Sequence, residues 1–405
     1  MHQKYLGRTG LVILISVLSM IPPLATDMYM PSLPELTAYY ETTESLAGFS
    51  MSIFFIFMAV GMLILGPASD KYGRKPVLLA SVTATMVFSA LCAWAPTIGW
   101  LLLMRAVQAF GAGGMVTIAT AMIRDSFEGR AMSRIISITQ ALTLLAPMFA
   151  PVLGALIIRS SNWKMTFVAL AALMALTLAG SALLTETLPK ERRNTGNIAH
   201  SILGLARAVR NRSFTALLLA GGLLTAPFMA YLGVASYIYI AGFGISETAF
   251  SLFFALTSAF SLTGPVLYMR IGPRPLGMAF AAGCAVVLIS AVLLFTIARN
   301  GPVWFLLAFV PFVILSSWFR PFISDRLLSM QKHDIGAASA AMNFGFTVIG
   351  SIAMMTGSLK WGSYINGLGF TMIIFLAASM FVAAFAVRGG FLELRAREVY
   401  NDHAC

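Results

Sequence analysis

The fold of this chain is decided by the stretch Gly66-Pro67-Ala68-Ser69-Asp70-Lys71-Tyr72-Gly73-Arg74-Lys75-Pro76. It places one acidic and three basic residues between two long apolar runs, with a glycine or proline at nearly every bend. A connection this short and this charged fits between two membrane-spanning helices on one face of a bilayer, because charged side chains are costly inside hydrocarbon. The sequence therefore predicts that residues 66–76 form a loop between two transmembrane helices.

The composition indicates an integral membrane protein. Of the 405 residues, 59% are hydrophobic and 10% are charged, whereas soluble domains carry about 25% charged residues. A spanning helix needs about 20 apolar residues. Twelve runs of suitable length lie near residues 11–30, 46–68, 77–95, 99–122, 135–157, 164–185, 214–240, 247–268, 276–297, 303–323, 337–358 and 367–387. We therefore expect an all-α integral membrane protein with twelve transmembrane helices in two six-helix halves.

The basic residues predict the orientation in the membrane. An even number of spans puts both termini on one side, and 21 of the 27 lysines and arginines lie on that side. Cytoplasmic connections carry the positive charge, so both termini are expected in the cytoplasm. The formal net charge of +12 is thus explained by the orientation of the protein in the membrane and does not suggest nucleic-acid binding. Lys4 and Arg8 precede the first run as in a signal peptide, but the run is long and ends in Asp27, which favours a retained helix.

Four segments are expected along the chain: a first six-helix half at 1–187, a cytoplasmic linker at 188–213, a second half at 214–388 and a cytoplasmic tail at 389–405. Apolar residues recur at helical spacing in the linker, which predicts an amphipathic helix on the membrane surface. These residues are Ile198, Ile202, Leu205 and Val209.

A weak internal repeat supports the division into halves. Arg270-Ile271-Gly272 follows the eighth run where Lys71-Tyr72-Gly73 follows the second, although Met269 stands in place of the acid. Duplicated halves with a binding site at their interface are the usual plan of a secondary transporter.

Asp27 is the acid that the sequence places inside the first span. It lies about 24 Å along the helix from Leu11, after Pro22 and Pro23, which interrupt the backbone ladder. An ionisable residue at this depth costs about 2.5 kcal/mol or more and marks a functional site by default. The alternative is that Asp27 caps the helix at the outer interface.

Arg105 is the corresponding base in the fourth run. A buried guanidinium keeps its charge and needs a partner, a cavity or water, and Gln108 lies one turn away on the same face. The alternative is that the Arg105 side chain extends far enough for its guanidinium to reach the outer interface. Arg320, near the inner end of the tenth run, is expected to be an interface anchor.

Paired prolines mark the fifth run, in Ala146-Pro147-Met148-Phe149-Ala150-Pro151-Val152-Leu153-Gly154. Prolines and small residues allow a helix to bend and to approach its neighbours closely. A substrate cavity is expected to draw on polar and aromatic residues of the first, second, seventh and eleventh runs, although packing accounts equally well for Asn343. The candidates are Tyr29, Met30, Phe54, Phe55, Tyr231, Tyr237 and Asn343, with Tyr239 beside them in the seventh run.

The chain resembles the major facilitator superfamily. Gly66 to Pro76 has the pattern G-x-x-x-D-K-x-G-R-K-P, similar to the family signature between helices 2 and 3. The resemblance implies that this stretch is a conformational latch at the cytoplasmic face, with Asp70 paired to a base or to the N-terminus of the eleventh helix. Its members are Gly66, Asp70, Lys71, Gly73, Arg74 and Lys75.

Three further motifs narrow the resemblance. Thr26 to Pro34 is similar to the helix 1 motif of the bicyclomycin- and chloramphenicol-resistance group of bacterial drug/proton antiporters, which implies that Asp27 carries the proton. Arg105, Gln108 and Gly111 resemble the R-x-x-Q-x-x-G pattern linked to proton coupling, with Ala109 where the family usually has glycine. Pro147, Pro151 and Gly154 resemble the helix 5 motif of exporters, G-P-x-x-G-G, although Ala150 and Ala155 replace two of its glycines. A packing kink without directional meaning is the alternative for that motif.

These observations favour a proton-coupled exporter of small amphiphilic, drug-like compounds in the bacterial inner membrane. We expect a monomer in the lipid bilayer that works by alternating access, with the proton gradient as its energy source and no cofactor. The resistance group also handles neutral compounds, so the charge preference of the substrate stays open. A transporter of the same fold for one metabolite or nutrient is the main alternative. A non-transport membrane protein does not explain an acid and an arginine within helices.

Enzymatic activity finds no support in the sequence. No nucleophile–histidine–acid set and no Walker-type phosphate loop is visible, so transport is not expected to depend on ATP. Cys92 and Cys284 lie inside apolar runs and Cys405 lies at the end of the chain, which gives neither a disulfide framework nor metal-ligand spacing.

Overall fold

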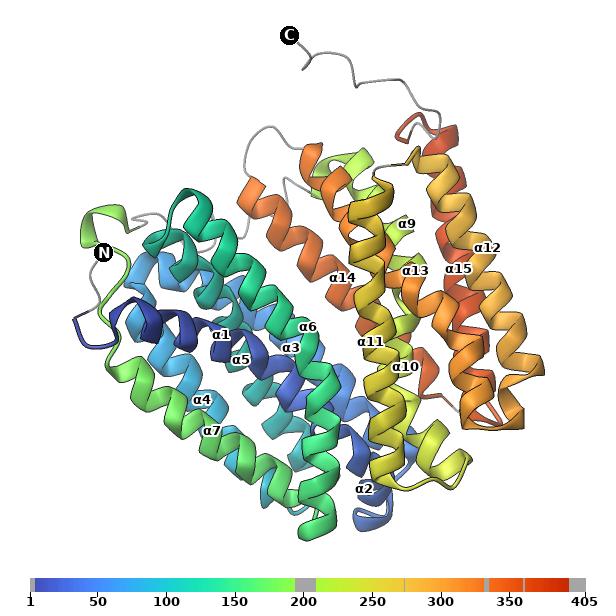
Figure 1. The fold of residues 1–405 in the computed structure, drawn as a ribbon, viewed down its shortest axis with the longest axis horizontal. Helices are drawn as coiled ribbons and strands as arrows, with labels where there is room; N and C mark the ends of the chain where they lie inside the picture. The colour runs from blue at the N-terminus through green and yellow to red at the C-terminus, as the bar shows by residue number, and fades with distance from the viewer. Residues whose placement is uncertain (1–3, 194–208, 273, 331–334, 360, 393–405) are drawn as a thin grey trace.

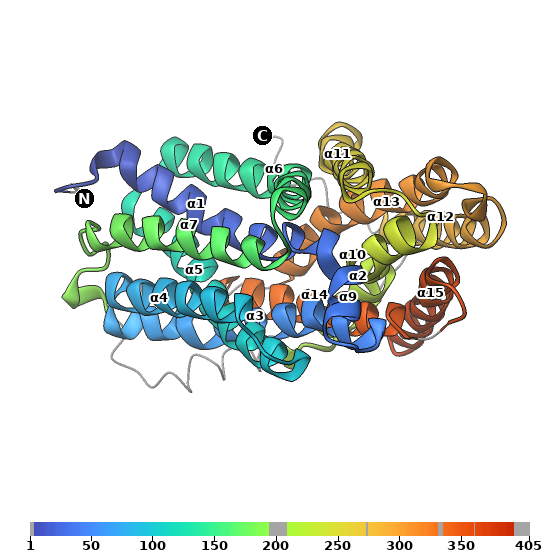
Figure 2. The same ribbon diagram turned by 90° about the horizontal axis from the view of Figure 1, so that it is seen from below.

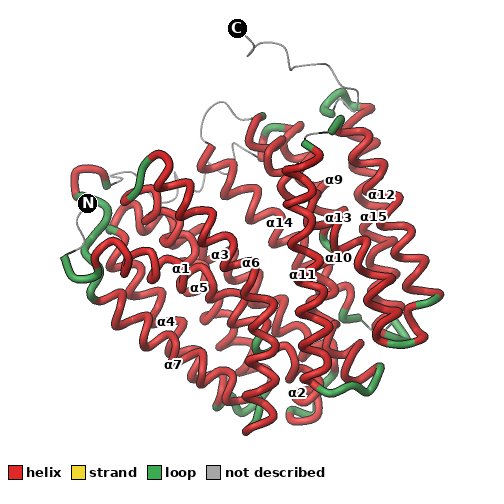
Figure 3. The backbone as a smooth tube through the Cα atoms, in the orientation of Figure 1, coloured by secondary structure: helices red, strands yellow, loops and turns green. Residues whose placement is uncertain are grey.

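The computed structural model describes residues 4–193, 209–272, 274–330, 335–359 and 361–392. The regular structure of this part of the chain is helical, with short connections (Figure 3). Twelve helical segments in it are long and apolar enough to cross a membrane. The prediction of an all-α protein with twelve spans is confirmed.

The first half holds six spans, of which the first is broken into three helical pieces. The elements are α1 (Gly7–Asp27), η1 (Met30–Ser32), α2 (Leu33–Tyr39), α3 (Glu44–Tyr72), α4 (Arg74–Ala93), α5 (Ile98–Ser126), α6 (Gly129–Ser160) and α7 (Lys164–Ala182). A short turn, η2 (Lys190–Arg192), follows α7.

The second half has the same number of spans. Its elements are α9 (Arg212–Thr225), α10 (Pro227–Ser236), η3 (Tyr237–Gly242, a π-helix), α11 (Glu247–Ile271), α12 (Leu276–Thr296), η4 (Ala298–Asn300), α13 (Pro302–Ser329), α14 (Ile335–Gly357) and α15 (Tyr364–Arg388). Figure 1 shows the two halves as separate groups, with α1–α7 in blue to green beside α9–α15 in yellow to red.

The predicted loop at residues 66–76 is wrong in its extent. The helix α3 continues to Tyr72 and α4 begins at Arg74, so that Gly73 alone lies between them. Its N–H still bonds the carbonyl of Ser69, and its φ of 104° then turns the chain. A positive φ of this kind suits glycine. The charged residues therefore extend the helices beyond the apolar runs and do not form a loop.

We call the end of the bundle that holds Gly73 and the start of α1 the terminal end, and the opposite end the far end. Gly272 closes α11 at the terminal end with a φ of 73°, as Gly73 closes α3. Most of the predicted amphipathic linker helix, including Ile198, Ile202 and Leu205, lies outside the described residues, as does most of the tail. The described chain resumes at Val209, and α9 begins at Arg212, two residues before the predicted start of the seventh run.

The halves meet through two helix pairs, α3 with α14 and α6 with α11. The helix α2 contacts η3 of the second half, and Figure 2 shows α2 between the two groups of helices. In the described residues the hydrogen bonds that join the halves lie toward the far end. Tyr237 bonds Thr37 at 3.0 Å, and Ser251 donates to the carbonyl of Pro151 at 2.9 Å. This structure is therefore closed between the halves at the far end.

Candidate functional site

Arg105 lies in the interior of the first half, with none of its surface exposed. Its Nη1 donates to the backbone carbonyl of Ala25 in α1 at 2.9 Å and to Oε1 of Gln108 at 3.0 Å. The rings of Phe54 and Tyr29 have their centroids 4.5 and 5.0 Å from its Cζ, within cation–π range. The alternative that Arg105 reaches the outer interface is thus wrong, because aromatic rings and backbone oxygens hold it inside.

Gln108 extends the contacts of Arg105 to α4. While its oxygen accepts from Arg105, its Nε2 donates to the hydroxyl of Ser89 at 2.7 Å. Gly111, one turn further along α5, packs against α4 beside Thr85. In the predicted pattern, Gln108 and Gly111 therefore contact α4, whereas Arg105 contacts α1 and bonds Gln108.

Asp27 ends α1 and is 4% exposed. The chain beyond it continues as η1 and α2, so that the first span runs to Tyr39. Asp27 is therefore not an interfacial cap, which was the alternative in the sequence. The hydroxyl of Thr26 lies 2.9 Å from its Oδ1, and no ion pair joins Asp27 to Arg105 or to another base in the described part of the chain.

The two prolines of α1 free a backbone acceptor that a neighbouring helix satisfies. Pro23 has no N–H to give to the carbonyl of Ser19. The hydroxyl of Thr143 in α6 donates to that carbonyl at 3.3 Å. The carbonyl that Pro23 leaves free within α1 is thus satisfied by α6, as expected for an interrupted hydrogen-bond ladder at membrane depth.

The proline-rich segment of α6 lies between α1 and the second half. Pro147 and Pro151 are within the helix, and the carbonyl of Pro151 accepts the hydrogen bond from Ser251 in α11. Gly154 packs so closely against α1 that a Cβ at this position would collide with the carbonyl of Met28. The segment therefore contacts both the residue after Asp27 and the opposite half.

The charged cluster at the terminal end is centred on Arg74. Its guanidinium lies 2.5 Å from Asp70 and 2.8 Å from Asp125 in α5, and it donates to the hydroxyl of Ser69 at 2.7 Å. The base that pairs with Asp70 in this structure is thus its neighbour on the next helix. Gly66, also in the predicted latch, packs against Thr117 of α5.

Glu186 completes this cluster, and sequence reasoning missed it. Its carboxylate accepts the backbone N–H groups of Arg74 and Lys75, at 2.9 and 3.2 Å, in the first turn of α4. It also lies 3.6 Å from Arg193. Two free N–H groups at a helix N-terminus attract an anion. The only signal in the sequence is an acid just after the sixth run, since the N–H groups that it accepts in α4 are more than a hundred residues away.

The predicted cavity residues are mostly packed inside the halves. Tyr29 bonds Ser50, Tyr231 stacks in a cluster with Phe309, and Tyr237 closes the far end. Tyr29, Met30, Phe54, Phe55, Tyr231 and Tyr237 are all buried, and Asn343 is exposed. In this structure these residues do not line one common cavity, because the two halves are in contact around the predicted cavity residues near the far end.

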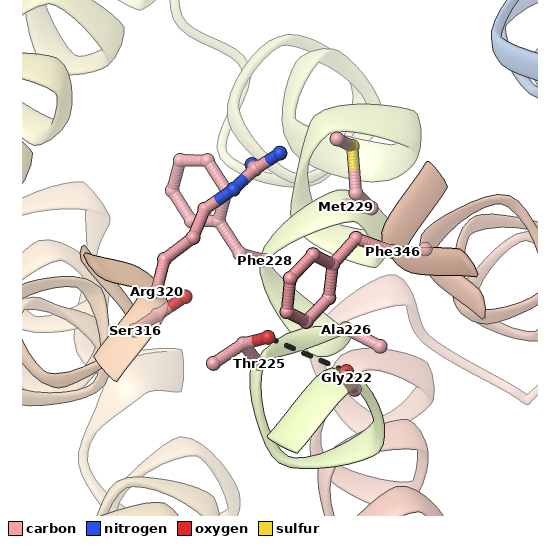
Figure 4. A pocket seen from close by; sticks show the side chains of 9 residues that line it. Gly222, Thr225, Ala226, Phe228, Met229, Ser316, Arg320 and Phe346 are labelled. Carbon is pink, nitrogen blue, oxygen red and sulfur yellow. Dashed lines mark hydrogen bonds between the residues drawn. The ribbon is translucent and has the colours of Figure 1, made fainter. Parts of the chain in front are cut away.

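A pocket instead lies in the second half between α9, α10, α13 and α14. It is lined by Gly222, Thr225, Ala226, Phe228, Met229, Ser316, Arg320, Phe346 and Gly350. Figure 4 shows Arg320 and Ser316 on α13, with Phe346 on the facing helix α14. Arg320, predicted to be an interface anchor, is exposed and lines this pocket, with its guanidinium 5.7 Å from the ring of Phe346.

The described residues contain no cluster of three or more histidine, cysteine, aspartate or glutamate side chains that could hold a metal ion. Cys92 and Cys284 are unpaired thiols. The charged groups that this structure offers are the buried carboxylate of Asp27, the buried guanidinium of Arg105 and the exposed guanidinium of Arg320 in the pocket.

Relatives of known sequence are bacterial proteins named for transport or for drug resistance. An uncharacterized MFS-type transporter, YdgK of Bacillus subtilis, is 29% identical over 384 residues, which cover 93% of each chain. Multidrug resistance protein MdtL of Klebsiella pneumoniae is 28% identical over 64% of this chain and 67% of its own. A bicyclomycin resistance protein homolog of Haemophilus influenzae is 29% identical over 60% of this chain and 62% of its own.

Solved structures share the fold at low sequence identity. A bacterial homolog to the human lysosomal transporter Spinster, in an inward-facing and unoccupied conformation, superposes with a TM-score of 0.74, at 14% identity, over 98% of this chain and 100% of its own. The D-xylose–proton symporter gives a TM-score of 0.70 at 16% identity, over 92% and 96% of the two chains. Residues 15–355 match the Major Facilitator Superfamily. With twelve membrane-spanning helices in two halves, the chain belongs to this superfamily.

Proposed function

We propose that this protein exports small amphiphilic, drug-like compounds across the bacterial inner membrane in exchange for protons. The observation that carries the proposal is Asp27, a carboxylate buried in the first span without a basic partner among the described residues. The relatives named for multidrug and bicyclomycin resistance support the substrate class. The proton gradient supplies the energy, and the protein acts as a transporter without a cofactor and not as an enzyme.

Asp27 is the proton carrier in this proposal. An ionised group without a partner is costly at membrane depth, and binding either a proton or a ligand relieves that cost. If the two compete, inward movement of the proton drives the drug outward. Arg105 couples this exchange to the helices, because it bonds the backbone of α1 close to Asp27 and, through Gln108, contacts α4.

The terminal end faces the cytoplasm in this proposal, because most of the basic residues lie there. The closed far end then faces outward, so the present structure corresponds to the state that loads drug from inside. Rocking of the halves about the site opens the far end. In the opposite state the cluster around Asp70 and Arg74 acts as a latch at the cytoplasmic face.

Inverted membrane vesicles with an imposed proton gradient test the proposal. Chloramphenicol, bicyclomycin and a cationic dye are added in turn, and lumenal pH is followed with a fluorescent probe. Drug-induced alkalinisation of the lumen is expected for the native protein and is expected to be lost in Asp27→Asn. The matched control is Asp325→Asn, which changes an exposed aspartate near the terminal end of α13.

The outcomes separate the parts of the proposal. A response that survives Asp27→Asn would retain antiport and exclude Asp27 as the proton carrier. If the native protein responds to none of the drugs, drug export is contradicted and transport of a single metabolite becomes the better assignment.

A further inference from the structure

The side chain of Arg320 lies deep in the membrane-spanning part of the second half. The helix α13 runs from Pro302 to Ser329 and is about 42 Å long at 1.5 Å per residue. Arg320 lies about 13 Å from its terminal end, and the hydrocarbon core of a bilayer is about 30 Å thick. Its Cα is therefore within the depth where a cation is costly.

The guanidinium of Arg320 lies against the neighbouring helix α14, and the side chain is exposed. Its Cζ lies 5.7 Å from the ring centroid of Phe346, which is the middle residue of α14 (Ile335–Gly357). A long arginine stem often carries the charge toward the interface. Here it carries the charge to the middle of the neighbouring helix, inside the pocket shown in Figure 4.

Arg320 has no anionic partner among the described residues. The described part of the second half contains two acids, Glu247 and Asp325. Glu247 begins α11 at the far end, and Asp325 accepts a hydrogen bond from Tyr268 at 3.4 Å. No hydrogen bond or ion pair from the Arg320 side chain to another described residue is present. A guanidinium remains charged, so its donors are available to a ligand.

The other walls of the pocket are largely apolar, so they suit the part of an amphiphile next to its charged group. Phe228 and Phe346 offer aromatic faces and Met229 an adaptable thioether, while Ser316 lies on the same helix as Arg320. The free space among these side chains is about 40 Å³, which admits a small polar group but not a whole drug-sized compound, so the rest of the compound has to extend beyond the pocket. The helices α10 and α14 of the pocket also contact α3 of the first half, so the pocket borders the interface between the halves.

We propose that Arg320 binds an anionic group of the transported compound, a carboxylate or a similar oxyanion attached to an apolar or aromatic body. The planar fork of a guanidinium matches two carboxylate oxygens. This inference rests on the proposed transport function and names its substrate class. The protein then carries charges of opposite sign on its two halves, Asp27 on the first and Arg320 on the second. Its expected substrates therefore include anionic and zwitterionic compounds as well as neutral ones.

Two dyes that differ by one methyl ester test the inference. Rhodamine 110 has a free carboxylate, and rhodamine 123 is its methyl ester with the same cationic ring system. Binding of each dye is measured by fluorescence polarisation at pH 7, with the full chain in phosphatidylcholine nanodiscs, and export is measured in vesicles. Arg320→Gln is compared with Arg299→Gln, which changes an arginine at the far end of the same half that contacts Asn366.

The native protein is expected to bind rhodamine 110 more tightly than rhodamine 123. Arg320→Gln is expected to weaken the binding of rhodamine 110 roughly tenfold and the binding of rhodamine 123 less than about twofold. Arg299→Gln is expected to leave the binding of both dyes unchanged. Retained binding of rhodamine 123 shows that Arg320→Gln is folded, and Arg320→Lys, which keeps the charge without the fork, is expected to be intermediate.

Three results would overturn the inference. One is equal binding of the two dyes by the native protein, and another is a preference for the carboxylate that survives in Arg320→Gln. The third is loss of rhodamine 110 binding when phosphatidylglycerol is added to the nanodiscs, which would assign Arg320 to lipid phosphate. Specific binding of rhodamine 110 without proton-coupled export would instead contradict the proposed function and leave the anion site in place.

Discussion

Arg105 in α5 donates a hydrogen bond of 2.9 Å to the backbone carbonyl of Ala25, two residues before Asp27 in α1. The arginine thus holds the backbone of the helix that carries the carboxylate, and not the carboxylate itself. A shift of α1 when Asp27 gains or loses a proton would directly move the carbonyl to which Arg105 donates. Through Gln108 the same shift would reach Ser89 of α4.

Arg105→Lys is expected to uncouple drug and proton movement. Lysine keeps the charge but cannot direct one planar group at both the Ala25 carbonyl and Gln108. Loss of a buried charge-assisted hydrogen bond should lower drug-induced proton movement about tenfold or more. The measurement is lumenal pH in inverted vesicles. Arg124→Lys, in the last turn of the same helix, is the control, and equal coupling in the two variants would contradict the role given to Arg105.

Glu186→Gln is expected to destabilise the protein through the start of α4. The carboxylate accepts two backbone N–H groups there and faces Arg193, but it is partly exposed and screened. We expect a loss of about 1 kcal/mol in the free energy of unfolding and a fall of about 2 °C in Tm. Thermal unfolding in detergent, followed by tryptophan fluorescence, measures it.

The control for this stability effect is Glu191→Gln, which changes an exposed acid five residues further along the chain. It is expected to leave Tm unchanged. If both variants lower Tm equally, the stabilisation comes from the general charge of this segment and not from the bonds that Glu186 makes to α4.

The sequence was sufficient to predict the twelve spans and the burial of Asp27 and Arg105. Hydrocarbon excludes charged side chains, so an apolar run and a charge inside it are both visible without any knowledge of packing. The residues at which the helices end were harder to predict from the sequence. Asp70 and Lys71 suggested a loop, yet a helix that leaves the hydrocarbon continues through polar residues until Gly73 turns the chain.

The pocket could not be predicted in the same way. The helix α13 is apolar on all sides, so its sequence does not show which side of it Arg320 occupies. Tyr231 likewise suggested a cavity, but its ring packs 4.6 Å from that of Phe309 inside the second half. The contacts of Glu186 join segments that are distant in the chain, and periodicity carries no information about them.

Opening of the far end can be followed with one reporter thiol. Ser358→Cys places it at the end of α14, where Ser358 is 5% exposed and where its backbone carbonyl accepts a hydrogen bond from Ser45 of the first half. The substitution keeps that backbone acceptor. Labelling by a membrane-impermeant maleimide then reports separation of the halves. The native cysteines to be replaced by alanine are Cys92, Cys284 and Cys405.

Asp70→Asn is expected to reduce labelling of the reporter. As a latch residue, Asp70 should stabilise the state in which the terminal end is closed and the far end is open. Its carboxylate already lies against Arg74 and is about half exposed, so the change should shift the balance of states more than it affects folding. Asp325→Asn serves as the control. Unchanged labelling together with an unchanged transport rate would show that Asp70 has no latch function.

Tyr237→Phe is expected to have the opposite effect and to raise labelling of Ser358→Cys. Its hydroxyl lies 3.0 Å from the hydroxyl of Thr37 and 3.2 Å from the carbonyl of Leu33, both in the first half. Losing these contacts should favour the open far end by about 1 kcal/mol, which is about a fivefold rise in the labelling rate. Tyr239→Phe is a closely matched control, because the Tyr239 hydroxyl is buried without a hydrogen-bond partner in the described residues. An equal rise in both variants would attribute the effect to packing of the π-helix, whereas a rise in Tyr237→Phe alone would identify its hydroxyl as a bond that opposes opening.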